Sequence, residues 1–404
     1  MKSDVIVIGA ELEALVAALR LSATCKSVRL LMPGAGSLHY SGGGLGVLNP
    51  SSTNPKNGNL PPYEAIDKLN DRHPYRILGS HRVRSAFDWF LKWDSENSSM
   101  FTCCDRNVAV LTMAGLTVPA FAVPASLATM ESVSGKRTTI VALDGHLDFS
   151  PDLCAAGLAR HGVESTIIRM PSPVAGDSVR IAAALDRHAP SFFKDLRRSL
   201  ADDAEVVILA AVLGLHRHDE VMQTAQDVLG IPVLEIATLP PSVFGLRLYY
   251  RLMKAIQGAG IEIHPGVRGL RANLANGKCE SLSDREGQTY KAGSFIAAHG
   301  GALIGGLEVD SRGSIIEPVF NLDVHQTHPL KHCDPAAVLD ALNQAGVEVD
   351  RQLRSTIDGK TIGNVHVAGG LMGHWNPVQE MSNEGVAIAS GQAAADFALE
   401  GLGL

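Results

Sequence analysis

The chain has 404 residues, of which 46% are hydrophobic, 19% charged and 5% aromatic, and its formal net charge is −7. This composition is typical of a globular protein with one large or two smaller domains. The acidic balance, with no basic stripe among the few aromatic residues, excludes a nucleic-acid-binding protein. No apolar run is long enough to span a membrane, and Asp4 and Glu11 interrupt the first one, so we expect a cytoplasmic chain. The six cysteines form no C-x-x-C pair, and we expect no metal site.

The N-terminal segment predicts the opening strand, turn and helix of a dinucleotide-binding fold. An apolar run at 5–8 is followed by Gly9, apolar residues then recur at helical spacing over 12–19, and a second apolar run follows at 28–32. The G-x-G-x-x-G fingerprint of this fold places glycines where the chain has Gly9, Glu11 and Ala14. Ala14 is a mild departure, whereas the carboxylate of Glu11 would repel a nearby diphosphate by on the order of several kcal/mol.

The middle of the chain predicts a separate α/β layer. Predicted strands and helices alternate there, at 138–141, 151–159, 165–168, 182–201, 205–211 and 219–229. Such alternation is typical of a parallel sheet covered by helices. We therefore predict an inserted cap or substrate domain over 106–242, within a discontinuous dinucleotide-binding domain formed by 1–105 and 243–404.

Three predicted buried strands end in glycine, at Gly9, at Gly300 and Gly301, and at Gly369 and Gly370. In an open parallel sheet, ligands bind beyond the carboxyl ends of the strands, and glycine there lets backbone N–H groups approach a phosphate or a flat ring. A long predicted helix over 383–399 follows the last of these ends and contains Gly385 near its start. This order predicts a Rossmann-like flavoprotein; the alternative is an α/β core with ordinary glycine turns.

Two further segments contain candidate site residues. In the loop SLHYSGGGLGVL, a backbone cradle at the flavin ring is predicted at Ser41, Gly42, Gly43 and Gly44. His39 in the same loop is a candidate for a catalytic polar group near the ring. Arg247 lies one turn before Arg251 on a predicted helix over 246–258, where a guanidinium could bind a phosphate or carboxylate. The alternative for the two arginines is a solvated helix face.

The chain resembles the B subunit of the anaerobic glycerol-3-phosphate dehydrogenases over nearly its whole length. Besides the N-terminal segment, the shared landmarks are SLHYSGGGLGVL, HPYRILG (73–79), GHLDFSPDLCAAGLA (145–159), TLPPSVFGLRL (238–248), EPVFNLDVHQT (317–327) and NVHVAGGLMGHWNPVQ (364–379). They occur in the order of the family, and TLPPSVFGLRL together with EPVFNLDV is the most specific pair.

This resemblance implies a flavoprotein component of a complex that oxidises sn-glycerol 3-phosphate to dihydroxyacetone phosphate and passes electrons to quinone. It implies two partners, namely a second, FAD-bearing catalytic subunit and an iron–sulfur subunit that docks the pair to the inner face of the cell membrane. It also implies FMN as the cofactor, with FAD as the alternative.

The residues leave the cofactor and the activity open. Besides Glu11, a second acid, Glu384, stands before Gly385, where a helix N-terminus would meet the flavin. FMN could be held by the later glycine turns, FAD could bind in a shifted pose, or the flavin could be absent. In the last case the chain would be a non-catalytic scaffold with a vestigial flavin fold. A related flavin dehydrogenase that acts on another small hydroxy compound is a further alternative.

Overall fold

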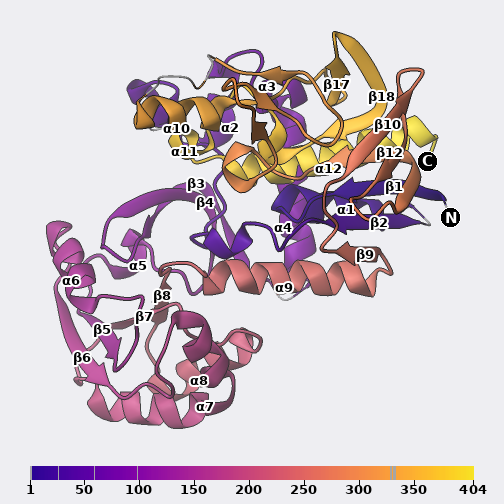
Figure 1. Cartoon of the computed structure of the whole chain (residues 1–404). Helices are drawn as coiled ribbons and strands as arrows, with labels where there is room; N and C mark the ends of the chain where they lie inside the picture. Colours follow the sequence, from indigo (N-terminus) through magenta and orange to yellow (C-terminus); the bar gives the residue numbers. More distant parts are fainter. Residues whose placement is uncertain (1, 26, 59, 98, 328–329, 331–333) are drawn as a thin grey trace. The chain divides into compact units, whose positions relative to one another are not determined.

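The computed structural model describes residues 2–25, 27–58, 60–97, 99–327, 330 and 334–404 (Figure 1). The chain divides into two compact units. Unit 1 consists of Met1–Ser37, Gly46–Glu96 and Arg251–Leu404, and unit 2 consists of Leu38–Leu45 and Asn97–Tyr250. The insertion predicted at 106–242 lies within unit 2, which begins before it, ends after it and also contains part of the glycine-rich loop.

Unit 1 is built on a sheet whose five central strands are parallel, in the order β18-β12-β1-β2-β9. The antiparallel strands β10 and β11 extend it beside β12, and β17 pairs with β18. The bounds are β1 (Lys2–Ile8), β2 (Val28–Met32), β9 (Glu262–Pro265), β10 (Arg271–Ala275), β11 (Lys278–Ser283), β12 (Thr289–Ala297), β17 (Arg354–Ile357) and β18 (Lys360–Val367). β1 is central and its residues 5–8 are fully buried, as expected for a strand covered on both faces.

The helices of unit 1 pack around this sheet, and α12 lies directly against α1 (Figure 1). Their close approach requires glycine, because a Cβ added at Gly391 would lie 2.5 Å from the carbonyl oxygen of Glu13. The bounds are α1 (Leu12–Leu21), α2 (Pro62–Ala65), α3 (Pro74–Leu78), α4 (Ser80–Glu96), α10 (Pro335–Gln344), α11 (Pro377–Glu380) and α12 (Asn383–Leu402). Two small ribbons complete the unit, β13 (Glu308–Val309) with β14 (Ile315–Ile316) and β15 (Val324–His325) with β16 (Gly346–Val347).

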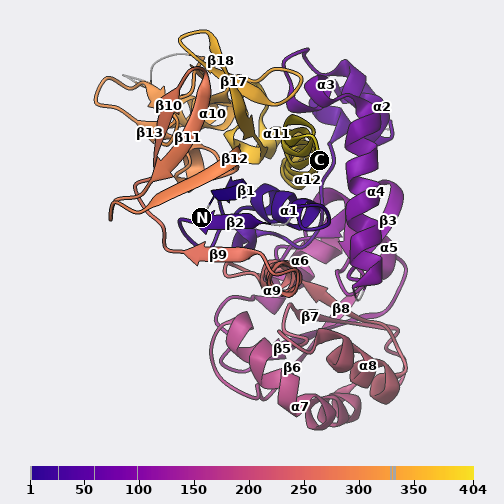
Figure 2. The same cartoon turned by 90° about the vertical axis from the view of Figure 1, so that its right-hand side faces the viewer.

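Unit 2 contains a four-stranded parallel sheet in the order β6-β5-β7-β8 and a hairpin of β3 and β4. Alternate residues of β5 and β7 face two different cores, one formed with α7 and α8 (Figure 2) and the other with α6. The bounds are β3 (Phe101–Leu111), β4 (Thr117–Pro124), β5 (Thr138–Leu143), β6 (Ser165–Met170), β7 (Val206–Ala210), β8 (Val233–Ile236), α5 (Met130–Val133), α6 (Pro151–Arg160), α7 (Ser178–Ser199) and α8 (His218–Leu229). The helix α9 (Val243–Gly258) begins in unit 2 and ends in unit 1.

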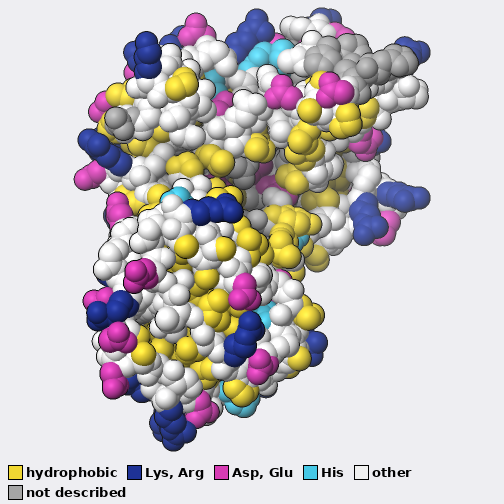
Figure 3. Space-filling view, turned by 90° about the vertical axis from the view of Figure 1, so that its left-hand side faces the viewer, with side chains coloured by type: hydrophobic (Ala, Val, Ile, Leu, Met, Phe, Trp, Pro, Cys, Tyr) yellow, Lys and Arg dark blue, Asp and Glu magenta, His cyan; other side chains and the backbone are white. Residues whose placement is uncertain are grey.

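The predicted fold class, an α/β protein with a dinucleotide-type parallel sheet, is confirmed by this topology. Several short elements were not predicted, among them β8, β17 and α10. Among the described residues, no helix combines the length and the apolar character that a membrane span needs. On the face shown in Figure 3, Lys and Arg side chains are scattered among Asp and Glu and form no basic stripe.

Two glycines of α12 test the packing of the first unit. We expect Gly391→Ala to lower the free energy of unfolding by about 1–3 kcal/mol, because the added methyl group must push α12 away from the backbone of α1. Gly401→Ala is the control: its Cβ would meet nothing within 4 Å, so the better helix propensity of alanine should raise the stability by up to about 1 kcal/mol. Urea unfolding followed by circular dichroism measures both. Equal effects of the two substitutions would contradict the close packing.

Candidate functional site

The three glycine-terminated strands of unit 1 are neighbours, and their carboxyl ends meet. A Cβ added at Gly9 would lie 1.8 Å from the carbonyl oxygen of Ala298, just beyond β12. One added at Gly301 would lie 2.6 Å from the carbonyl oxygen of Gly370, just beyond β18. Gly9 has a φ of 140°, a conformation that residues with a side chain rarely adopt. The turns after β1, β12 and β18 therefore form one tightly packed backbone surface at the edge where such sheets bind ligands.

Ala14 lies under the turn after β1 and Gly385 lies near the start of α12, and both are buried. The methyl group of Ala14 would lie 3.1 Å from a Cβ at Gly9, so a small residue is needed under the turn. Gly385 donates its N–H to the carbonyl oxygen of Gly46 at 2.9 Å, and a Cβ there would meet the hydroxyl of Tyr75. Gly385 thus lets the segment at 46–47 approach the start of α12.

The most informative side chain of this region is Glu13, which the sequence analysis did not select. Glu13 is 4% exposed, and its Oε1 accepts a hydrogen bond from the N–H of Gly370 at 3.1 Å. A Cβ added at Gly369 would lie 2.0 Å from the Cδ of Glu13, so the carboxyl group fills the space above this turn. The N–H of Gly369 is also engaged, by the hydroxyl of Ser390 at 2.8 Å.

Glu11, which the fingerprint singles out, is buried at the position that precedes α1. Its side chain makes no capping hydrogen bond to the helix. Instead, Oε2 of Glu11 accepts hydrogen bonds from the N–H of Ser37, at 3.0 Å, and from the Ser37 hydroxyl. The carboxylate therefore joins the turn after β1 to the loop after β2.

Two acids, Glu11 and Glu13, thus lie where the fold would offer an anion site, and a third, Glu384, lies near the start of α12. Burial, and next the negative charge of Glu11, raise the pKa of Glu13 to about 8. Burial also raises the pKa of Glu384, whose carboxylate accepts a hydrogen bond from the N–H of Gly46 at 3.4 Å. The environment of these groups disfavours further negative charge.

The residues fit one part of a flavin nucleotide and not another. The glycine turns pack against one another and leave no room for side chains. They therefore present bare backbone at this edge, a cradle that allows the close approach of a flat ring or a ribityl chain. The start of α1 does not fit an ionised diphosphate, because Glu13 already engages the N–H of Gly370 and Glu11 lies beside it. We therefore derive no reaction step through a bound flavin.

The remaining predicted residues lie in unit 2, so the candidate set is divided between the units. A Cβ added at Gly43 would lie 2.7 Å from the Cγ of Phe244, and a Cβ added at Gly44 would lie 2.7 Å from the Cβ of Ala120. A Cβ added at Gly42 would meet nothing within 4 Å. His39 is half-buried, and its carbonyl oxygen accepts a hydrogen bond from the N–H of Ser242 at 2.6 Å. The glycines at 43 and 44 are thus explained by packing within the unit, and Ser41 precedes them in the same loop.

Arg247 is buried and fully engaged within unit 2. Its Nη1 and Nη2 contact the two carboxylate oxygens of Glu235 at 2.7 and 2.9 Å, and its Nε donates to the carbonyl oxygen of Gly214 at 2.8 Å. Glu235 also accepts hydrogen bonds from the hydroxyl of Ser126 and the N–H of Leu213. Burial opposes the charge of Glu235, but Arg247 and these donors hold its pKa below the ordinary value. This bidentate pair favours a structural role for Arg247 over anion binding.

A second polar cluster joins two of the sequence landmarks. The hydroxyl of Ser178, at the start of α7, lies 3.0 Å from Nε2 of His146, 3.1 Å from Asp148 and 2.8 Å from the hydroxyl of Thr238. His146 and Asp148 belong to GHLDFSPD, and Thr238 begins TLPPSVFG. Because Ser178 is fully buried, this cluster fixes the chain and is not a site for a reacting group.

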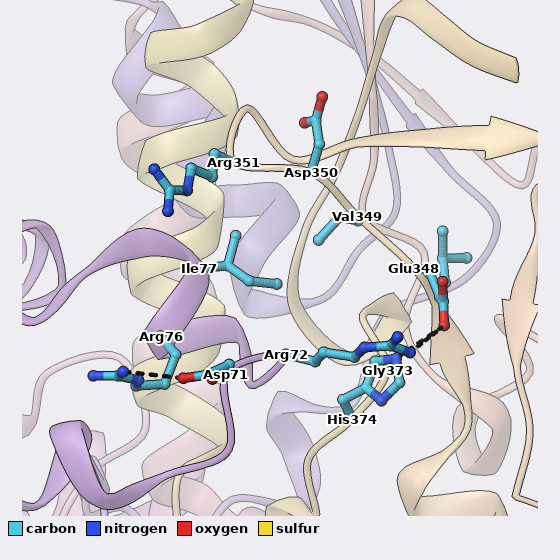
Figure 4. Close-up of a pocket in the computed structure, with 11 residues that line it drawn as sticks. Asp71, Arg72, Arg76, Ile77, Glu348, Val349, Asp350, Arg351, Gly373 and His374 are labelled. Carbon is cyan, nitrogen blue, oxygen red and sulfur yellow. Dashed lines mark hydrogen bonds and ion pairs between the residues drawn. The ribbon is translucent and has the colours of Figure 1, made fainter. Parts of the chain in front are cut away.

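Unit 1 also contains a cavity of about 660 Å³, lined by segments at 71–77, 347–351 and 373–374 (Figure 4). Two of the arginines that line it are paired internally: Arg72 with Glu348 at 3.2 Å, and Arg76 with Asp71 at 3.1 Å. Within the described residues, potential metal-ligand atoms gather within 4.8 Å of one another at His325, Glu348 and His374. Because Arg72 already contacts the same Glu348 oxygen as His374, we assign no cation to this group.

The buried ion pair of Arg247 and Glu235 gives a prediction that distinguishes a structural role of Arg247 from anion binding. We expect Arg247→Ala to lower the free energy of unfolding by about 3–5 kcal/mol, since it leaves Glu235 charged and buried. Arg198→Ala, which removes an exposed pair with Asp195, is the control and should change it by about 1 kcal/mol or less. Urea unfolding measures both.

The same pair determines a pH dependence. The pKa of Glu235 is lower in the folded chain than in the unfolded chain. The ionised carboxylate therefore stabilises the fold at any pH above the ordinary pKa of glutamate, and this stabilisation is lost as the pH falls through the lower pKa of the folded chain. In Arg247→Ala this stabilisation should be absent. An unchanged unfolding curve together with a raised KM would instead support anion binding.

Comparisons with known proteins agree with this architecture. A family model described as an FAD binding domain matches residues 4–386. A probable B subunit of anaerobic glycerol-3-phosphate dehydrogenase from Halobacterium salinarum is 31% identical, with 100% of this chain and 99% of that protein covered. The B subunit of anaerobic glycerol-3-phosphate dehydrogenase from Yersinia enterocolitica is 28% identical, with 96% of each chain covered.

Among solved structures, a quinol fumarate reductase chain from E. coli is 9% identical, with a TM-score of 0.46 and with 100% of this chain and 71% of that chain covered. We draw no argument from that likeness. The family match makes FAD the first expectation for a flavin, and the expectation of FMN finds no support. The chain has an FAD-binding domain, is one component of a multi-subunit oxidoreductase, and belongs to the family of anaerobic glycerol-3-phosphate dehydrogenase B subunits.

Proposed function

We propose that the chain acts in a complex that oxidises sn-glycerol 3-phosphate to dihydroxyacetone phosphate and passes the electrons to quinone. The observation that carries this proposal is the end-to-end similarity to the B subunits of that family, which extends over both units. The proposed partners are a second, FAD-bearing subunit and an iron–sulfur subunit that docks the assembly to the inner face of the cell membrane.

Oxidation of a secondary alcohol to a ketone removes a hydride from carbon and a proton from oxygen, so the site needs a proton acceptor and an electron acceptor. Among the candidates of this chain, His39 has a titratable ring and is half-buried. It therefore remains the proposed proton-handling group. Arg247 is not proposed for the phosphate of the substrate, because its guanidinium is occupied by Glu235.

A non-catalytic scaffold is the second candidate, and one observation favours it specifically. The carboxyl group of Glu13 accepts the hydrogen bond of the Gly370 N–H, a donor at the edge where a flavin nucleotide would bind. A chain that supports the catalytic partner without binding a flavin would need no open cradle there.

Steady-state assays of the reconstituted complex test the proposal. With wild-type chain, we expect reduction of a quinone analogue that depends on sn-glycerol 3-phosphate. His39→Ala should lower kcat by about 10²- to 10⁴-fold, the usual contribution of a general base. His161→Ala, an exposed histidine at the end of α6, is the matched control and should leave kcat unchanged.

Two results would contradict parts of the proposal. Full activity of the His39→Ala complex would exclude this histidine and favour the scaffold. Reduction driven by another hydroxy compound, and not by glycerol 3-phosphate, would replace the proposed substrate.

A further inference from the structure

The backbone donors that a dinucleotide would use in this fold are partly engaged by the chain's own carboxyl groups. In a dinucleotide-binding fold the diphosphate lies at the N-terminus of the first helix, beside the carboxyl ends of the strands. Here Oε1 of Glu13 accepts from the N–H of Gly370, after β18, and Oε2 of Glu11 accepts from Ser37, after β2. Two internal carboxyl groups thus stand where an external anion is expected.

We propose that Glu13 and Glu11 compete with the diphosphate of a dinucleotide for this cradle, so that the chain binds FAD only while Glu13 is protonated. This inference rests on the proposed role of a flavin in the chain. It assigns Glu13, at a variable position of the glycine fingerprint, as the group that controls the affinity and pH dependence of the cofactor site.

The position of the Glu13 carboxyl group explains why it would compete with a phosphate. Glu13 is only 4% exposed, and its carboxyl group lies so close to Gly369 that a single added methyl would overlap it. A phosphate that reached the N–H of Gly370 would meet this carboxyl group directly. When ionised, the two groups repel each other; when Glu13 is protonated, its O–H can donate a hydrogen bond to a phosphate oxygen.

The charged groups around Glu13 set the direction of the effect. At the start of its own helix Glu11 is negative, and near the end of that helix Arg20 is paired with Asp396 of α12 at 2.7 Å. On α12, Glu384 lies near the start of the helix, and on the loop after β12, His299 is paired with Glu317 at 3.0 Å.

The negative charge of Glu11 disfavours ionisation of Glu13. Burial and the charge of Glu11 raise the pKa of Glu13 to about 8, so its titration falls at that pH.

The test is the affinity of the full chain for FAD at pH 7 and pH 9, with riboflavin as the control ligand because it has no phosphate. Quenching of flavin fluorescence gives both dissociation constants. We expect FAD to bind roughly tenfold more weakly at pH 9 than at pH 7, because one proton titrates near pH 8. Riboflavin should bind equally at both values.

Two variants separate this mechanism from a general loss of structure. Glu13→Gln keeps the shape of the side chain and removes its charge, so the FAD affinity should become independent of pH. Glu13→Ala should behave in the same way and serves if the first variant does not fold. Glu262→Gln, which removes a carboxylate paired with Arg29 at the edge of the same sheet, should keep the wild-type dependence.

An FAD affinity that is equal at pH 7 and pH 9 in the wild-type chain would overturn the inference, as would a tenfold difference that persists in Glu13→Gln. Failure of both FAD and riboflavin to bind, in the wild-type chain and in every variant, would instead remove the flavin role itself. At pH 9, binding of riboflavin alone by the wild-type chain, with FAD binding recovered in Glu13→Gln, would support the competition.

Discussion

The architecture of unit 1 depends on the close contact of three backbone turns at the carboxyl ends of β1, β12 and β18. Gly9 contacts the carbonyl of Ala298, and Gly301 contacts Gly370, at separations that leave no room for a side chain. Parallel pairing of the three strands brings these turns to one edge, where α1 begins. Glycine occupies the points of closest contact, so the acids at this edge stand beside them, Glu11 in the turn before α1 and Glu13 in the first turn of the helix.

Burying these acids is unfavourable by itself, and hydrogen-bond donors of the chain compensate for it. Glu11 accepts one hydrogen bond from the N–H and one from the hydroxyl of Ser37, Glu13 accepts one from the N–H of Gly370, and Glu384 accepts one from the N–H of Gly46. The three backbone N–H groups belong to turns and loops, outside the ladders of the sheet. The carboxyl groups therefore satisfy donors that would otherwise be buried without partners, which offsets part of the desolvation penalty.

Patterns along the sequence predicted the parallel sheet because buried strands and amphipathic helices leave clear periodic signals. Glu11 was noticed because it occupies a glycine position of a known fingerprint. Glu13 was missed because the fingerprint accepts any residue there, and its contact with Gly370 spans 357 positions. The partner of Arg247 could not be predicted for a similar reason: helical spacing shows which face a residue occupies but not that Glu235 lies opposite it. Periodic patterns in the sequence therefore predict helices and strands, whereas the partner of a charged side chain depends on which distant segments the topology brings together.

The balance between stability and ligand binding explains why the position of Glu13 matters beyond packing. Its pKa is about 8 in the folded chain and 4.5 in a model compound, so between these values the folded state binds more protons than the unfolded state. Stability therefore falls as the pH rises through this window, and a neutral residue at position 13 would avoid the loss. An ionisable group at this site thus opposes folding above pH 4.5 while it faces the cradle for an anionic cofactor. A glutamine of similar shape would avoid this loss, so packing at this position does not by itself require an ionisable group.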